Sequence, residues 1–299
     1  MILITEAQID SLLASTDSLL QNVFTFDCAG HTMPGSSHRG AAVAHQDTLE
    51  RRSDFLRELR NTMSSWVYSK EKYKSLLDAE LIERGKDLQN AVSHIQALVA
   101  DKFRKGHPQG QFGELLLFNL LQHFFKAAPI LRKMSITTNP AIERHGSDAI
   151  HYRPIGGKNV IFIGESKTYA SKYRFKAALD DAVSSILTSF ANFSVELGRF
   201  VYEDFIEDSL RDVSAKIKRN TLPNVVYELV CVISYQENEN KKSGQTQAEI
   251  EQTIEKAING NLSKYQNDYG NVDQGALSKI HFVIFPFWEL DALLDGFDQ

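Results

Sequence analysis

Apolar positions along the chain recur with two different periods. Over residues 5–20 and 46–105 they lie three and four residues apart between charged side chains, which predicts amphipathic helices. From residue 110 onward, helical stretches alternate with short apolar runs typical of strands. The predicted order there is one helix, three strands, one or two helices, a strand, a helix, a strand and a last helix. Such an order indicates an α/β fold, a mixed β-sheet core flanked by helices.

Three segments set the details of this fold. Residues 111–126 are apolar almost all round, which predicts a helix buried on most sides. The strands expected after it cover residues 134–138, 148–153 and 160–167, followed later by residues 225–235 and 279–287. Residues 29–45 are rich in Gly, Ser, Ala and His, so we expect a loop there. A break near residue 106 suggests a mainly helical N-terminal region, 1–105, and a second domain, 106–299.

The glycine pair Gly156-Gly157 predicts a two-residue hairpin turn, because glycine adopts positive φ at no steric cost. If Ile155 then pairs with Lys158, the same register sets Asp148 directly opposite Glu165. Lys167 follows two residues later, so it shares a face of the strand with Glu165. Gly164, inside an otherwise apolar strand, predicts that another element approaches the backbone closely.

Two carboxylates that face each other across a sheet repel, and a divalent cation between them relieves the repulsion. Oxygen ligands suit Mg²⁺ or Mn²⁺, so we expect Asp148, Glu165 and the carbonyl of Ser166 to hold such an ion together with water. Lys167 would orient or deprotonate a water molecule, or offset charge in the transition state. These residue types predict metal-dependent phosphodiester hydrolysis. Glu114 is either a further carboxylate aimed at the metal or a first-turn acid that complements the helix dipole.

The Glu-x-Lys spacing is weak by itself, since Glu239-Asn240-Lys241 repeats it within a polar stretch. A surface Glu–Lys pair at a hairpin end is the structural alternative. Charge supports the functional interpretation. The 299-residue chain has a net charge of −5, which argues against strong unaided binding of nucleic acid. Nine Lys and Arg residues but only three acids fall between Arg132 and Lys176.

This basic stretch predicts a local phosphate-binding surface, or alternatively a solvated charged face. The residues expected to contact a DNA backbone are Arg144, Lys172, Arg174 and Lys176. Two cysteines are too few for a disulfide framework, and no Cys/His cluster has zinc-site spacing. Apolar runs are too short for a membrane span, and the start lacks a signal peptide, so we expect a cytoplasmic protein that is not membrane-bound.

Asp148, Glu165 and Lys167, preceded by Glu114 on a helix, resemble the PD-(D/E)xK nuclease superfamily; Ser147 stands where the motif has proline. Over residues 106–190, the segments GELLLFNLL, HGSDAIH and GESKTY resemble more closely HamA, the family of nuclease subunits of bacterial Hachiman anti-phage systems. This resemblance implies a restriction-endonuclease-like fold and DNA degradation as the defence outcome. It also implies a helicase partner, HamB, that restrains the nuclease and couples it to DNA.

Two other functions remain open on the sequence. The chain could be an inactive nuclease fold that binds DNA or assembles a complex, in which case the two carboxylates need not converge. It could also be a restriction or repair nuclease, which shares the chemistry and differs in substrate choice.

Overall fold

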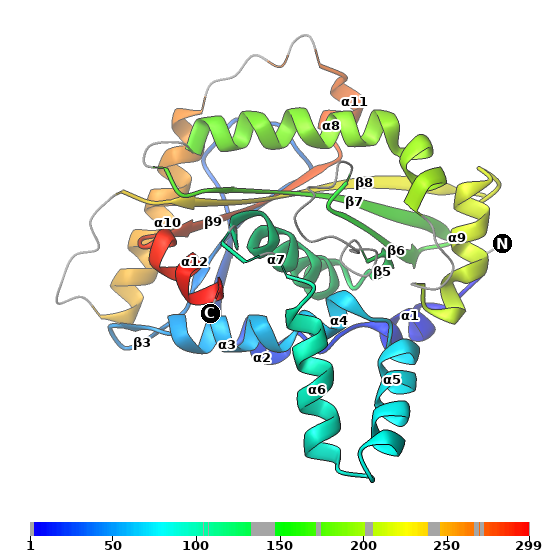
Figure 1. Ribbon diagram of the computed structural model, residues 1–299. Coiled ribbons are helices and arrows are strands. Elements are labelled where there is room, and N and C mark those ends of the chain that lie inside the picture. The colour runs from blue at the N-terminus through cyan, green and yellow to red at the C-terminus, as the bar shows by residue number, and fades with distance from the viewer. Residues whose placement is uncertain are drawn as a thin grey trace.

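The computed structural model describes residues 3–103, 105–106, 108–132, 147–171, 175–200, 206–238, 246–265, 269 and 272–298, apart from the side chains of 131 and 194–200. One mixed sheet of seven strands forms its centre (Figure 1), in the order β1-β2-β9-β8-β7-β6-β5. The strands are β1 (Val23–Asp27), β2 (Ser37–Val43), β5 (Ala128–Leu131), β6 (Ala149–Ile155), β7 (Lys158–Tyr169), β8 (Val225–Gln236) and β9 (Ile280–Phe287). The predicted α/β fold class is confirmed.

Four central strands, β2, β9, β8 and β7, run parallel, and antiparallel pairs complete both edges. The short strands β3 (His45–Gln46) and β4 (Leu49–Glu50) pair separately. The helices are α1 (Glu6–Leu12), α2 (Asp17–Leu20), α3 (Arg52–Asn61), α4 (Met63–Val67), α5 (Lys70–Glu83), α6 (Leu88–Ala100), α7 (Pro108–Phe125), α8 (Phe175–Phe200), α9 (Arg211–Lys218), α10 (Gln247–Lys264), α11 (Gln274–Leu277) and α12 (Leu290–Asp298), with a 3₁₀ turn at Asp208–Leu210.

Helices cover both faces of the sheet, with α8 on one side and α7 on the other (Figure 1). Alternation along β7 divides its side chains between the two resulting cores. Ile161 and Ile163 pack in the core that contains α8, whereas Val160 and Phe162 pack in the core that contains α7. The apolar character of α7 all round is thereby explained, because α12, α4 and the sheet enclose it.

Strand β2 corrects the prediction of a loop over residues 29–45. Gly40 leaves space for the ring of Phe26, since a Cβ there would lie 2.2 Å from the ring. Ala41, Ala42 and Val43 are fully covered within the sheet. Small residues are required between β1 and β9, and this requirement comes from long-range pairing that composition does not reveal.

The N-terminal residues contribute both helices and sheet. Helices α3 to α6 confirm the mainly helical reading, and α5 and α6 form a hairpin that projects from the body (Figure 1). Strands β1 and β2 nevertheless extend the sheet beside β9. The division at residue 105/106 stays a prediction, and the strand expected at 134–138 lies outside the described residues. Among the helices described, none has the length and apolarity needed to cross a bilayer.

Candidate active site

The β6–β7 hairpin has the register that its sequence predicts. Gly156 and Gly157 have φ of 54° and 79°, and Ile155 pairs with Lys158. The pairing continues to Ala149 opposite Gly164, and the backbone N–H of Asp148 donates to the carbonyl of Gly164 at 3.0 Å. A turn with positive φ at both central residues matches the twist of the strands and prevents a register shift.

Ser166 holds the carboxylate of Asp148 at this end of the hairpin. Oδ2 of Asp148 accepts hydrogen bonds from the backbone N–H of Ser166 at 2.9 Å and from its Oγ at 3.0 Å. Donors of this kind stabilise an ionised carboxylate and fix its orientation. The Asp148 side chain is therefore tied to the residue that follows Glu165.

Glu165 and Lys167 lie side by side on the face of β7 that α8 covers. Nζ of Lys167 donates to Oε1 of Glu165 at 3.0 Å, and Glu165 is only 6% exposed. Burial by itself would lower the pKa of Lys167. The attraction and hydrogen bond of Glu165, aided by Asp148 and Asp181, outweigh burial and raise this pKa above its ordinary value. The lysine is a cation at neutral pH and lies beside the carboxylates rather than in the core.

Helix α7 approaches the same end of β7 through a glycine. A Cβ on Gly113 would lie 2.6 Å from Oγ1 of Thr168 and 3.2 Å from Oγ of Ser166. Nε2 of Gln109, one turn earlier, donates to the carbonyl of Thr168 at 2.6 Å. Glu114, next to Gly113 and half-buried, thus belongs to the turn of α7 that meets the site end of the strand. Because α7 begins at Pro108 and has no acid in its first turn, the predicted role of Glu114 as a first-turn acid is wrong, and its role as a metal ligand stays a prediction.

Gly164 also has the close neighbour that its position predicts. A Cβ there would lie 3.0 Å from Leu117 and 3.2 Å from Leu121, both in α7. The helix therefore packs directly on the backbone of β7 one residue before Glu165.

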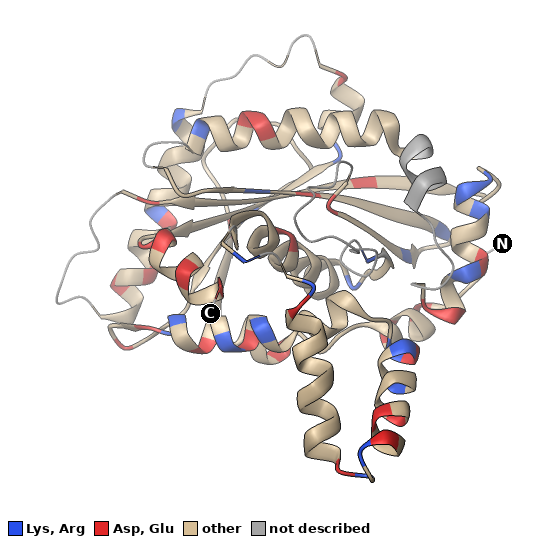
Figure 2. Ribbon diagram, in the orientation of Figure 1, with Lys and Arg blue, Asp and Glu red and all other residues tan. Residues whose placement is uncertain are grey.

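The basic stretch is less uniform than the sequence suggests. Arg132 is buried against Glu207, and Arg153 pairs with Glu6 and Asp10 of α1. Two of the nine cations thus connect parts of the fold. Lys176 is exposed in the first turn of α8, whereas Arg144, Lys172 and Arg174 lie outside the described residues. Figure 2 shows basic and acidic positions interspersed along α3, α5 and α9.

Two further residues near Lys167 were not predicted. The hydroxyl of Tyr169 donates to the carboxylate of Asp181, an exposed residue of α8, and the charge of Asp181 also acts on Lys167. Tyr169 lies two residues beyond Lys167, so strand alternation sets it on the same face and could have identified it. Asp181 is brought in by the packing of α8, for which the sequence carries no local signal.

The donor set fits a hard divalent cation better than zinc. Within the described ranges, no group of three His, Cys, Asp or Glu side chains is arranged to hold a metal. Two carboxylates, a backbone carbonyl and water remain, and Mg²⁺ commonly retains several waters beside one or two carboxylates. Cys231 beside Glu165 on β8 offers no alternative chemistry, because burial, followed by the charge of Glu165, raises its pKa well above the ordinary value.

Comparison with known proteins identifies the family of the chain. No curated protein matches the chain. Among protein families, HamA matches residues 17–299, which includes the whole sheet, the β6–β7 hairpin and every helix described above except α1. A match over nearly the whole length leaves no large region outside the family. The chain therefore belongs to the HamA family, and this supports its place as a component of Hachiman anti-phage defence.

Proposed function

We propose that the protein is a metal-dependent DNA nuclease, the effector of a Hachiman system, controlled by a helicase partner. The main support is that Glu165 and Lys167 are paired at one end of β7, that Asp148 is hydrogen-bonded to the intervening Ser166, and that the charge of Asp148 also acts on Lys167. Membership of the HamA family supports the defence role, and with it the expectation of the helicase partner HamB.

Each residue has a distinct part in this chemistry. Asp148, Glu165 and the carbonyl of Ser166 would hold Mg²⁺ or Mn²⁺. When bound, the ion polarises the scissile phosphate and lowers the pKa of a coordinated water. Ser166 orients the carboxylate of Asp148 through its two hydrogen bonds. The Lys167 ammonium lies beside Glu165, and its charge would stabilise the negative charge that develops on the phosphate oxygens.

DNA binding is the weaker part of the site. Lys176 is exposed where α8 begins, and Lys172 and Arg174 precede it in sequence, so a phosphate backbone could follow this helix end. A chain with net charge −5 would still associate poorly with DNA by itself. A helicase that delivers the substrate would compensate for this, which agrees with control by a partner.

The decisive experiment measures degradation of double-stranded DNA by the purified protein with its helicase partner and Mg²⁺. We expect Glu165→Ala and Lys167→Ala each to reduce the rate by about 10²–10³-fold or more, and EDTA to abolish it. Lys241→Ala is the matched control, because Glu239-Asn240-Lys241 repeats the spacing elsewhere, and it should leave the rate unchanged.

Each alternative has its own result. Full activity in Glu165→Ala would refute the site assignment. If the wild-type complex binds DNA but never cleaves it, the protein is an inactive nuclease fold that serves in binding or assembly. Cleavage confined to particular sequences or lesions without the helicase would indicate a restriction or repair nuclease.

A further inference from the structure

A pocket of about 330 Å³ lies away from the hairpin site, beneath the N-terminal helices. It is formed by the end of α1, the junction of α4 with α5, one residue of α7 and the residue that follows β5. The lining residues are Leu12, Ala14, Ser64, Ser65, Tyr68, Ser69, Lys70, Tyr73, Gln122 and Arg132. Four segments far apart in sequence thus build one cavity, whose volume falls in the range of small-molecule sites.

Its frame is held by hydrogen bonds that do not depend on a ligand. Nε of Arg132 donates to the carbonyl of Ser65 at 3.2 Å, and the backbone N–H of Ala14 donates to Oε1 of Gln122 at 2.8 Å. Arg132 and Gln122 are 3% and 2% exposed, so the polar groups at the base are fixed before anything binds. Such preorganisation lowers the cost of binding.

The lining contains two cations and no carboxylate. Nζ of Lys70 donates to the carbonyl of Ser11 at 2.7 Å, and within the described part of the chain this leaves two of its three ammonium hydrogens for another acceptor. Behind the pocket, Arg132 is paired with Glu207, and burial and a hydrogen bond with Glu71 raise the pKa of Glu207 to about 7. The same hydrogen bond, aided by Arg132 and Lys70, lowers the pKa of Glu71, so this carboxylate stays ionised and attracts Lys70 from outside the lining.

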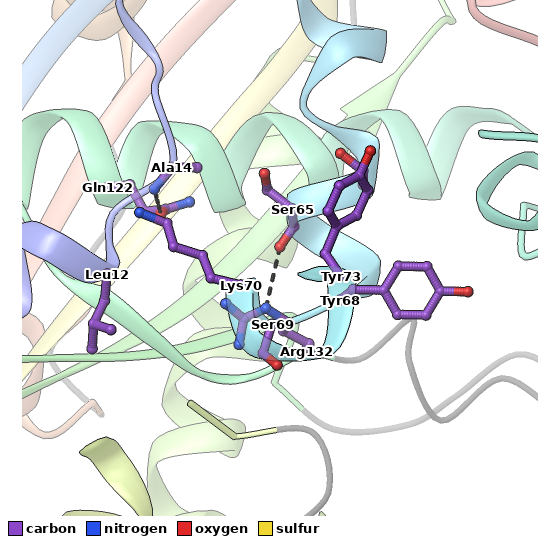
Figure 3. A pocket seen from close by; sticks show the side chains of 10 residues that line it. Leu12, Ala14, Ser65, Tyr68, Ser69, Lys70, Tyr73, Gln122 and Arg132 are labelled. Atoms are coloured by element: carbon purple, nitrogen blue, oxygen red, sulfur yellow. Dashed lines mark hydrogen bonds between the residues drawn. The ribbon is translucent and has the colours of Figure 1, made fainter. Parts of the chain in front are cut away.

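The remaining groups favour a ring and hydroxyl groups in the ligand. Figure 3 shows the tyrosines on one side of the pocket and Leu12 with Gln122 on the other, with Lys70, Ser69 and Arg132 between them. Aromatic side chains stack on nucleobases regardless of sequence. The hydroxyls of Ser64 and Ser65 suit the oxygens of a sugar, whereas Oγ of Ser69 already accepts the backbone N–H of Lys72 as the N-cap of α5.

We propose that this pocket binds a small organic phosphate with a planar ring, of the size of a nucleoside monophosphate. Lys70 takes the phosphate, the serine hydroxyls face the sugar, and Tyr73 packs against the base. The site is separate from the hairpin carboxylates and does not depend on the proposed nuclease activity.

The test is calorimetric titration of the full-length protein in EDTA with AMP, adenosine, ribose 5-phosphate and inorganic phosphate. We expect AMP to bind with a Kd of about 100 µM or below, and each fragment at least about tenfold more weakly. Lys70→Gln should lower the affinity for AMP about tenfold, because it removes a charge-assisted contact with the phosphate. Lys72 is exposed on the same helix and does not line the pocket, so the Lys72→Gln variant should bind AMP with the wild-type affinity.

Two further variants keep the result interpretable. Tyr73→Leu retains apolar volume but removes the ring. It should therefore lower the affinity for AMP and leave the affinity for inorganic phosphate unchanged. Glu165→Ala should bind AMP normally, which separates this pocket from the nuclease site. The proposal is overturned if AMP does not bind at millimolar concentration, if folded Lys70→Gln binds it unchanged, or if Glu165→Ala abolishes binding.

Discussion

At the scale of single residues, the contact between Ser166 and Asp148 is the most informative feature of the hairpin site. Removing the Ser166 hydroxyl takes away one of the two hydrogen bonds that Ser166 donates to Oδ2 of Asp148 and leaves the one from its backbone N–H. A hydrogen bond to a charged group contributes about 1.5–3 kcal/mol. We expect Ser166→Ala to slow metal-dependent DNA cleavage about tenfold and to raise the Mg²⁺ concentration needed for half-maximal rate.

Thr168→Val is the matched control for this change. Thr168 lies two residues further along the same face of β7, and its hydroxyl has no hydrogen-bond partner among the residues described. The two variants remove equivalent groups from one strand. Equal loss of activity in both would show that packing of α7, rather than the contact with Asp148, determines the rate.

His151 makes stability depend on pH. Its ring is fully buried on β6, donates from Nδ1 to the carbonyl of Ala127 at 2.9 Å and packs against Phe118. Burial lowers its pKa from 6.5 to about 3. The unfolded chain takes up a proton below pH 6.5 and the native state does not. The stability contribution is therefore complete above pH 6.5 and is lost as pH falls from 6.5 towards 3.

The slope attributable to this group is up to about 1.4 kcal/mol per pH unit. His151→Gln retains a donor towards Ala127, so we expect a variant that is less stable at pH 8 but whose free energy of unfolding falls less steeply between pH 6 and 4. Urea unfolding at several pH values measures the difference in slope. The difference isolates His151, because the pKa of His38, also lowered by burial, contributes equally to both proteins. If the free energy of unfolding falls equally steeply with pH in the wild type and in His151→Gln, His151 is not the group responsible.

At the scale of elements, α7 and β7 show how much the sequence discloses. The hairpin register was predictable because two adjacent glycines determine it locally. The burial of α7 was predictable because apolar residues occupy almost every side of the helix. Gly164 in β7 indicated that another element packs closely on the strand, but the sequence did not show that this element is α7. Strand β2 was missed since only pairing with β1 and β9 makes Gly40 and Ala41 suitable there. Asp181 was missed because the packing of α8 brings it to the site.

Two glycines of α7 test the docking of this helix on β7. Gly113→Ala would bring a methyl group to 2.6 Å from Oγ1 of Thr168, so helix and strand must separate. We expect a loss of about 1–3 kcal/mol in the free energy of unfolding, together with lower nuclease activity, since Glu114 and Ser166 adjoin the contact. A Cβ on Gly110 would meet no atom of the described residues within 4 Å outside its own helix turn, and Gly110→Ala should be neutral or stabilise by up to about 1 kcal/mol. Chemical denaturation of both variants measures whether overpacking against β7 or the gain in helix propensity dominates the stability change at each position.

At the scale of the whole molecule, the N-terminal region and the site-bearing core share one sheet. Arg132, just after β5, is buried against Glu207 and donates to the carbonyl of Ser65 in α4, while the backbone N–H of Lys70 in α5 donates to Glu207. Arg153 of β6 pairs with Glu6 and Asp10 of α1. Removing one partner of a buried ion pair commonly costs about 3–5 kcal/mol. These contacts cross the predicted division at residue 105/106.

A fragment of residues 106–299 tests that division. It would lack β1 and β2, expose the edge of β9 and leave the buried Arg132–Glu207 pair without its contacts to α4 and α5. An open edge strand with an apolar face favours aggregation. We expect the fragment to aggregate or to unfold in urea without a cooperative transition, whereas the full chain unfolds cooperatively. As a control, replacing residues 82–88 with a Gly/Ser linker removes the exposed Ile82 and Leu88 at the tip of the α5–α6 hairpin and should preserve the cooperative transition. A fragment that unfolds cooperatively, with a denaturant slope proportionate to its length, would instead establish residues 106–299 as an independent domain.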